Sequence, residues 1–130
     1  MNLNEHIAYW ITGAEHDYES AESLFNAGKF DWCLFICHIV IEKSLKAAFV
    51  KTNNNKLPPK IHNLVRIAEL SPIGFSEAQV ELLDRINDSN IEARYPDFKF
   101  SFYEHCSKEF TEEYFLKVKE LMLWIKSRIL

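Results

Sequence analysis

The feature that most constrains this fold is an almost uninterrupted apolar run between residues 32 and 45. The run contains Trp32, Leu34, Phe35, Ile36, Ile39, Val40, Ile41 and Leu45. On a helix these side chains surround the axis instead of forming one stripe, and a helix that is apolar on all sides is buried among neighbours. We therefore predict a central helix from Trp32 to about Lys51.

A buried strand is the alternative interpretation of the apolar run, because β-branched residues are frequent between positions 36 and 41. Strands are usually only about 4–8 residues long, however, and no other segment of this chain offers a partner strand. The residues that mark turns are scarce, with 3 Gly and 4 Pro in 130 residues. The sequence thus favours an all-α fold.

Two helices are expected to flank this run in the first half of the chain. Apolar residues from Leu3 to Phe25 recur every three or four positions, which predicts an amphipathic helix that Gly28 terminates. Asp31 is the expected N-cap of the central helix. A short helix is predicted between residues 61 and 70, and Ser71-Pro72-Ile73-Gly74 stops it.

The second half of the sequence predicts two more helices. Ser76 and Gln79 form a capping-box pattern before a helix from about Glu77 to Glu92, whose buried side carries Val80, Leu83 and Ile86. Residues 97–110 are expected to be irregular or to hold one helical turn, pinned to the bundle by Phe98, Phe100, Phe102 and Phe110. Thr111 is the expected cap of a last helix, whose inward stripe is Phe115, Val118, Met122, Ile125 and Ile129.

Together these elements predict one domain over residues 1–130, an antiparallel up-and-down bundle of about five helices. The formal net charge is −4, so the sequence shows no overall basic footprint for nucleic acid. We expect no leader peptide and no membrane span, because no apolar stretch approaches the roughly 18 residues that a span needs. Three cysteines, an odd number, are expected to stay reduced in a cytoplasm.

Side chains that could bind a metal or catalyse a reaction give no complete motif. Cys33 and Cys37 lie four residues apart beside His38, but they sit in the most apolar stretch, where a neutral thiol packs as a small hydrophobe. Cys106 beside His105 has no second cysteine nearby, so we predict no metal site and no cofactor. The chain also lacks a Gly-x-Ser-x-Gly elbow, a Gly-rich phosphate loop and a His-Glu-x-x-His pair.

Two polar clusters remain as candidate sites. On the central helix, Glu42 and Lys46 have the spacing of a helix-surface ion pair, or else, with Lys43, they mark where this helix meets a cleft or a partner. The second cluster lies between Asn87 and Asp97 and includes Asn90, Arg94 and Tyr95. Its polar residues either terminate a helix, or Arg94 and Tyr95 offer a donor fork and a stacking ring to a phosphate or base.

Four segments of the chain form a recognisable set: Ala14-x-x-Asp17-x-x-x-Ala21-x-x-Leu24, Ile41-Glu42-Lys43-Ser44-Leu45-Lys46-Ala47, His62-x-Leu64, and Ala93-Arg94-Tyr95-Pro96-Asp97. In this order and at these distances, they resemble the HEPN domain family (higher eukaryotes and prokaryotes nucleotide-binding). The resemblance implies a helical bundle that forms homodimers and often works with a minimal nucleotidyltransferase. It also implies that some members are metal-independent ribonuclease toxins, with an Arg and a His separated by four to six residues.

That ribonuclease spacing is absent from this sequence. The corresponding positions after Arg94 are Lys99, Phe100 and Ser101, and neither Arg85 nor Arg66 is followed by a suitably placed histidine. We therefore expect a non-catalytic or degenerate dimeric binding module, with Glu42, Lys43, Lys46, Asn90, Arg94, Tyr95 and Asp97 as candidate nucleotide- or partner-binding residues. A ribonuclease toxin that uses Arg94 with His105, and a purely structural interaction bundle, remain the alternatives.

Overall fold

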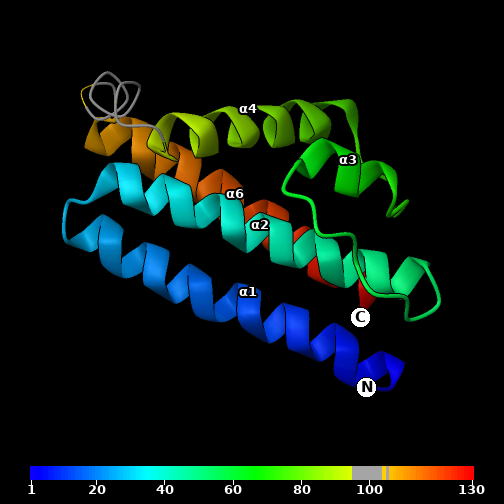
Figure 1. Cartoon of the computed structure of the whole chain (residues 1–130). Coiled ribbons are helices and arrows are strands. Elements are labelled where there is room, and N and C mark those ends of the chain that lie inside the picture. The colour runs from blue at the N-terminus through cyan, green and yellow to red at the C-terminus, as the bar shows by residue number, and fades with distance from the viewer. Residues whose placement is uncertain (95–103, 105) are drawn as a thin grey trace.

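The computed structural model describes residues 1–94, 104 and 106–130, and these residues form five helices and no strand. The helices are α1 (Leu3–Asn26), α2 (Phe30–Thr52), α3 (Leu64–Glu69), α4 (Glu77–Arg94) and α6 (Lys108–Ile129). Figure 1 shows the four long helices side by side, each running opposite to the long helix before it, with α3 at one end of α4. The predicted all-α antiparallel bundle is confirmed.

Helix α2 is the centre of the bundle, because it packs against α1, α3, α4 and α6. The side chains of Leu34, Ile41 and Leu45 are fully buried. Fully burying one such side chain contributes roughly 1.5–3 kcal/mol to folding. The apolar run is therefore a helix that its neighbours enclose, as its sequence predicts.

A tight turn joins α1 to α2. Gly28 has φ +75°, a left-handed conformation that glycine adopts at little cost, and the amide of Lys29 donates to the carbonyl of Leu24 at 2.8 Å. The prediction of Asp31 as the N-cap is wrong. Helix α2 already begins at Phe30, so Lys29 occupies the N-cap position. Asp31 lies buried inside the first turn of α2.

Side chains cap both helices of the next segment. Asn63 accepts from the amide of Arg66 at 3.2 Å, so α3 begins at Leu64, later than the sequence suggests. The amide of Ser76 donates to Gln79 Oε1 at 2.8 Å and the amide of Gln79 donates to Ser76 Oγ at 3.1 Å, which confirms the capping box of α4.

One predicted core position of α4 is wrong. Leu83 and Ile86 are fully buried, but Val80 is 36% exposed. Six residues separate Val80 from Ile86, which places it about 120° further round the helix. Because α4 packs on α2 through the side that carries Leu83 and Ile86, Val80 falls at the edge of the core.

Helix α6 begins one turn earlier than predicted. Ser107 Oγ accepts from the amide of Phe110 at 3.1 Å and is the N-cap, so Thr111 is not the cap but a fully buried residue within the helix. The predicted inward stripe is confirmed, since Phe115, Val118, Met122, Ile125 and Ile129 are all buried. Phe98, Phe100 and Phe102 lie outside the described residues, whereas Phe110 packs on the ring of Tyr114.

Crossing a bilayer needs a helix that is both long enough and apolar enough, and the described part of the chain contains none.

Candidate functional site

The structure describes only the α2 part of the predicted site. Glu42, Lys43 and Lys46 are all in α2. Asn90 and Arg94 belong to the last turns of α4, but their side chains lie outside the described structure. Tyr95, Asp97 and His105 also lie outside the described residues. The arrangement of the Arg94 cluster therefore stays a prediction.

His38, Glu42 and Lys46 form one polar row along α2, at intervals of four residues. Lys46 Nζ lies 3.1 Å from Glu42 Oε2, which confirms the ion pair that their spacing predicts. The pair is not a surface pair, because the side chains of Lys46 and Glu42 are only 9% and 12% exposed. The ammonium of Lys46 also lies 5.6 Å from the ring centroid of Trp10 on α1, a favourable cation–π contact.

Lys43 points away from this row toward α1. Its Nζ lies 2.6 Å from Asp17 Oδ2, and both side chains are partly exposed. A Cβ placed on Gly13 would lie 3.3 Å from Lys43 Cδ, so the glycine leaves room for the lysine to cross α1. The structure thus separates Lys43 from the Glu42–Lys46 pair and assigns it to the α1–α2 contact.

The connector between α2 and α3, residues 53–63, runs back across α2 and adds His62 to the polar row (Figure 1). His62 Nδ1 lies 2.8 Å from Glu42 Oε1, and its side chain is 61% exposed. The contact with Glu42 therefore uses Nδ1, while most of the His62 side chain faces solvent. His62 was not among the candidate binding residues predicted from the sequence.

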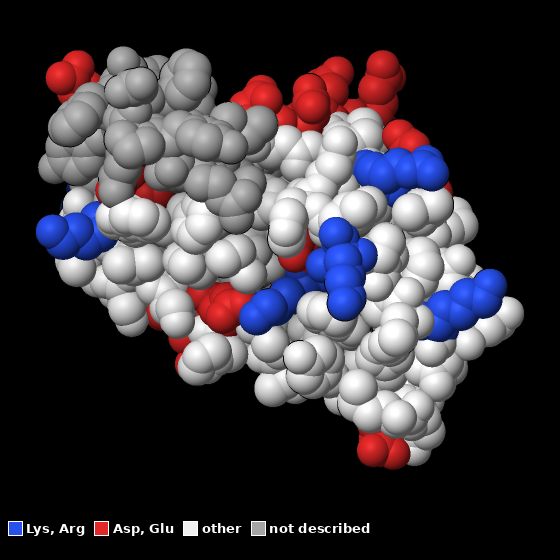
Figure 2. Space-filling model, in the orientation of Figure 1, with Lys and Arg blue, Asp and Glu red and all other residues white. Residues whose placement is uncertain are grey.

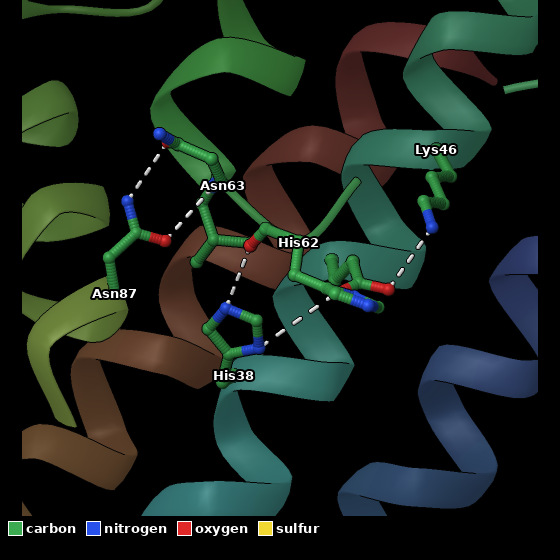
Figure 3. Close-up of polar contacts among 7 residues, drawn as sticks. His38, Lys46, His62, Asn63 and Asn87 are labelled. Atoms are coloured by element: carbon green, nitrogen blue, oxygen red, sulfur yellow. Dashed lines mark hydrogen bonds and ion pairs between the residues drawn. The ribbon is translucent and has the colours of Figure 1, made fainter. Parts of the chain in front are cut away.

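His38 lies beneath His62 and binds the same segment. Its Nε2 donates to the backbone carbonyl of His62 at 3.0 Å, and its Nδ1 lies 3.9 Å from Glu42 Oε1 (Figure 3). Burial lowers the pKa of His38 below its ordinary value, although the neighbouring carboxylate of Glu42 opposes this shift. The buried ring is therefore neutral near pH 7.

Two asparagines extend this network to α4. Asn87 Oδ1 accepts from the amide of Leu64 at 3.0 Å, and Asn87 Nδ2 donates to Asn63 Oδ1 at 3.1 Å (Figure 3). Asn87 thus satisfies a free amide of the first turn of α3 and fixes the side chain that caps this helix. The connector is held on one side by α2 and on the other by α4.

The described residues offer no group of three or more His, Cys, Asp or Glu side chains that could hold a metal ion. Cys33 and Cys37 are fully buried in α2. A hydrogen bond from Cys33, together with burial, raises the pKa of the Cys37 thiol well above its ordinary value. These thiols pack as small apolar groups, in agreement with the prediction for them.

Charge on the visible face agrees with the acidic balance of the sequence. Figure 2 shows basic side chains scattered over the middle of this face and acidic ones gathered along the edge that α4 forms. Helix α4 carries the exposed carboxylates of Glu77, Glu81, Asp84 and Asp88. The described part of this face offers no continuous basic strip for a polyanion.

Sequence reasoning found two residues of the described cluster, Glu42 and Lys46, because their spacing along one helix is a usable local signal. It did not add His38, which lies one turn before Glu42. The contacts of His62 with Glu42 and of Asn87 with Asn63 gave no such signal, because the two residues of each contact lie 20 or more positions apart along the chain.

Comparison with known proteins places this fold. The model of the HEPN domain family matches residues 7–128. Among solved structures, the crystal structure of TT1696 from Thermus thermophilus is similar, with a TM-score of 0.81 and 18% identity over 98% of this chain and 99% of that chain. This likeness shows a shared fold, whereas no curated protein matches the sequence. The family match covers nearly the whole described bundle, so the chain belongs to the HEPN domain family.

Proposed function

We propose that this HEPN-domain protein is a non-catalytic, dimeric, nucleotide-associated binding module that works with a minimal nucleotidyltransferase in a toxin–antitoxin-like pair. The observation that carries the proposal is in the sequence. No arginine is followed at the ribonuclease spacing by a histidine, and a general base displaced by even about 1 Å loses much of its effect.

The described cluster supports binding over catalysis. Both oxygens of Glu42 already have partners, in His62 and Lys46, and the Nε2 of His38 donates to a backbone carbonyl. Groups paired in this way fix the shape of a surface, whereas a catalytic acid or base must release its proton to a substrate. His62 is the exposed member of the cluster and could contact a ligand.

Homodimerisation is supported by the outer side of α6. Leu116 and Leu123 are 51% and 49% exposed and lie seven residues apart, which places them on one side of the helix. Trp124, the neighbour of Leu123, packs on Phe75 with ring centroids 5.3 Å apart. It lines a hollow of about 330 Å³ with Gln79 and other residues of α4 and α6.

The dimer is tested by sedimentation velocity over a range of concentrations. We expect the wild type to sediment as a dimer and the double variant Leu116→Glu/Leu123→Glu as a monomer with unchanged circular dichroism. Leu57→Glu is the matched control, because Leu57 is an exposed leucine on the connector. A wild type that stays monomeric at high concentration contradicts a dimer through Leu116 and Leu123 of α6.

The partner is tested by reading the adjacent open reading frame and, where it encodes a minimal nucleotidyltransferase, by co-expressing the two proteins. We expect them to co-purify, and we expect Arg94→Glu to reduce the complex while the helical content stays unchanged. A thermal shift of the chain with ATP tests nucleotide association. If the melting temperature does not change with ATP and the nucleotidyltransferase does not co-purify, the results favour the alternative of a purely structural interaction bundle.

The ribonuclease alternative makes opposite predictions. If Arg94 and His105 cleave RNA, expression of the chain arrests growth, and Arg94→Ala relieves the arrest. We expect normal growth and intact RNA after incubation with the purified chain. Metal-independent cleavage that Arg94→Ala and His105→Ala both abolish would overturn the non-catalytic proposal.

A further inference from the structure

We propose that His38, Glu42 and His62 form an acid-sensitive latch, which holds the connector over the polar row of α2 at neutral pH and releases it when the buried ring of His38 takes up a proton. We use the word latch for these three residues. Opening would uncover Glu42 and Lys46. The latch itself does not depend on the proposed partner, because it rests only on contacts within this chain.

The first step is the tautomer of His38. A backbone carbonyl only accepts hydrogen bonds, so the 3.0 Å contact requires a proton on His38 Nε2. In the neutral ring the other nitrogen then carries a lone pair. That lone pair faces Glu42 Oε1 at 3.9 Å, too far for a hydrogen bond.

The second step is the use of a single carboxylate oxygen. His62 Nδ1 occupies Glu42 Oε1 at 2.8 Å, and His38 Nδ1 faces the same atom. The other oxygen is bound to Lys46. In the closed arrangement His38 Nδ1 lies too far from Glu42 Oε1 for a hydrogen bond, so a proton on His38 Nδ1 would have no short hydrogen bond to this carboxylate.

The third step is the count of charge. With the His38 ring neutral, the charges of Lys46 and Glu42 balance. A proton on His38 adds a second positive group beside one carboxylate, and the His38 side chain is almost wholly buried. Separation of the connector from α2 relieves this repulsion and hydrates both rings.

The groups that surround His38 compensate for this charge only in part, because burial is the largest effect on the pKa of this ring. Helix α2 contributes Glu42 and also Lys46, which contacts His38 only through Glu42. The connector contributes His62. Helix α4 contributes Asn87, which is uncharged, and α1 contributes the Trp10 ring beside Lys46. Among the described residues, Glu42 is thus the one anion in the cluster.

The direction of the pH dependence follows from burial. Burial lowers the pKa of His38 in the closed state, so the open state, with a hydrated ring near the ordinary pKa of about 6.5, binds more protons. The closed state is therefore most favoured above pH 6.5 and loses stability as the pH falls toward the lowered pKa.

The test is amide hydrogen exchange at pH 7.5 and pH 5.0, corrected for the intrinsic pH dependence of exchange. In the wild type we expect the amide of Leu64, which donates to Asn87 Oδ1 at the end of the connector, to lose protection by at least about tenfold at pH 5.0, while Val118 in α6 keeps its protection. His38→Gln retains a donor for the carbonyl of His62 but cannot titrate, and we expect it to abolish the acid effect. His16→Gln, at an exposed histidine of α1, is the control and should behave as the wild type.

Equal protection of the Leu64 amide at the two pH values, or a His38→Gln variant as acid-sensitive as the wild type, would overturn the latch. Nitrogen NMR of the wild-type imidazoles gives an independent check that does not require any variant to fold. We expect the Nε2–H tautomer for His38 at pH 7.5. The Nδ1–H tautomer, or a ring already charged at that pH, would also refute the proposal.

Discussion

Two neighbouring rows of α2 are both buried, but they are held in different ways. Leu34, Ile41 and Leu45 form an apolar row that is enclosed without a specific partner. His38, Glu42 and Lys46 form the polar row, and each member has a defined partner. Burial of apolar area is non-directional, whereas a buried charge is tolerated only when it is paired. The first row makes the bundle stable, and the second specifies where the connector lies.

The largest expected effect is in the apolar row. Leu45→Ala removes a fully buried side chain and should lower the free energy of unfolding by about 3 kcal/mol. Urea denaturation at pH 7.5 and pH 5.5 measures it. Because the row contains no titratable group, we expect the same loss at both values. A loss that depended strongly on pH would break the distinction between the two rows.

The second largest loss of stability is expected in the polar row. Glu42→Gln leaves the buried ammonium of Lys46 without its carboxylate, and we expect a loss of about 2 kcal/mol in the same assay. The matched control is Glu69→Gln, which breaks the exposed Arg66–Glu69 pair and should cost less than about 0.5 kcal/mol. Replacing both charges, as in Glu42→Leu/Lys46→Met, should recover part of the loss. If the Glu42 and Glu69 variants lost the same free energy of unfolding, burial of the polar row would make no difference to stability.

The contact of the connector with α4 tests whether polar contacts hold only the connector or the whole bundle. Asn87→Ala removes the acceptor of the Leu64 amide and the donor to Asn63, and we expect a loss of about 1–2 kcal/mol. Hydrogen exchange should show the effect first at Leu64 and in the rest of α3. If the amides of α1 lost protection equally, Asn87 would support the whole bundle and not the connector.

The smallest expected effect lies outside both rows. Ser76→Ala removes one half of the capping box of α4 and should cost about 1 kcal/mol, with loss of exchange protection confined to the first turn of that helix. Ser20→Ala, at an exposed serine of α1, is the control and should change stability little. Protection lost in the connector would mean that the α4 N-terminus also takes part in holding it.

The fold was predictable because its signals are local. The apolar run of α2, the periodic stripe of α6 and the Ser76–Gln79 box each lie within one element. The errors at Asp31 and Thr111 are at helix starts, where Lys29 and Ser107 occupy the N-cap positions instead. A capping residue competes with its neighbours for the same free amides, and the geometry of the preceding turn decides the outcome.

The candidate site was less predictable. The sequence pointed to Glu42 and Lys46, since their spacing on one helix fixes their distance. It could not show that Lys43 pairs with α1, nor that His62 covers Glu42, because both contacts depend on how separate segments pack. The binding roles of Arg94, Tyr95 and their neighbours remain predictions from the family resemblance.

The abrupt turn at Gly28 also has a consequence for the order of folding. It leaves only three residues between α1 and α2, so these two helices can meet at a small cost in loop-closure entropy. Helix α6 must close a loop of more than 50 residues to reach α2. We therefore expect the helical hairpin of α1 and α2 to assemble first and to serve as the template on which the later helices dock.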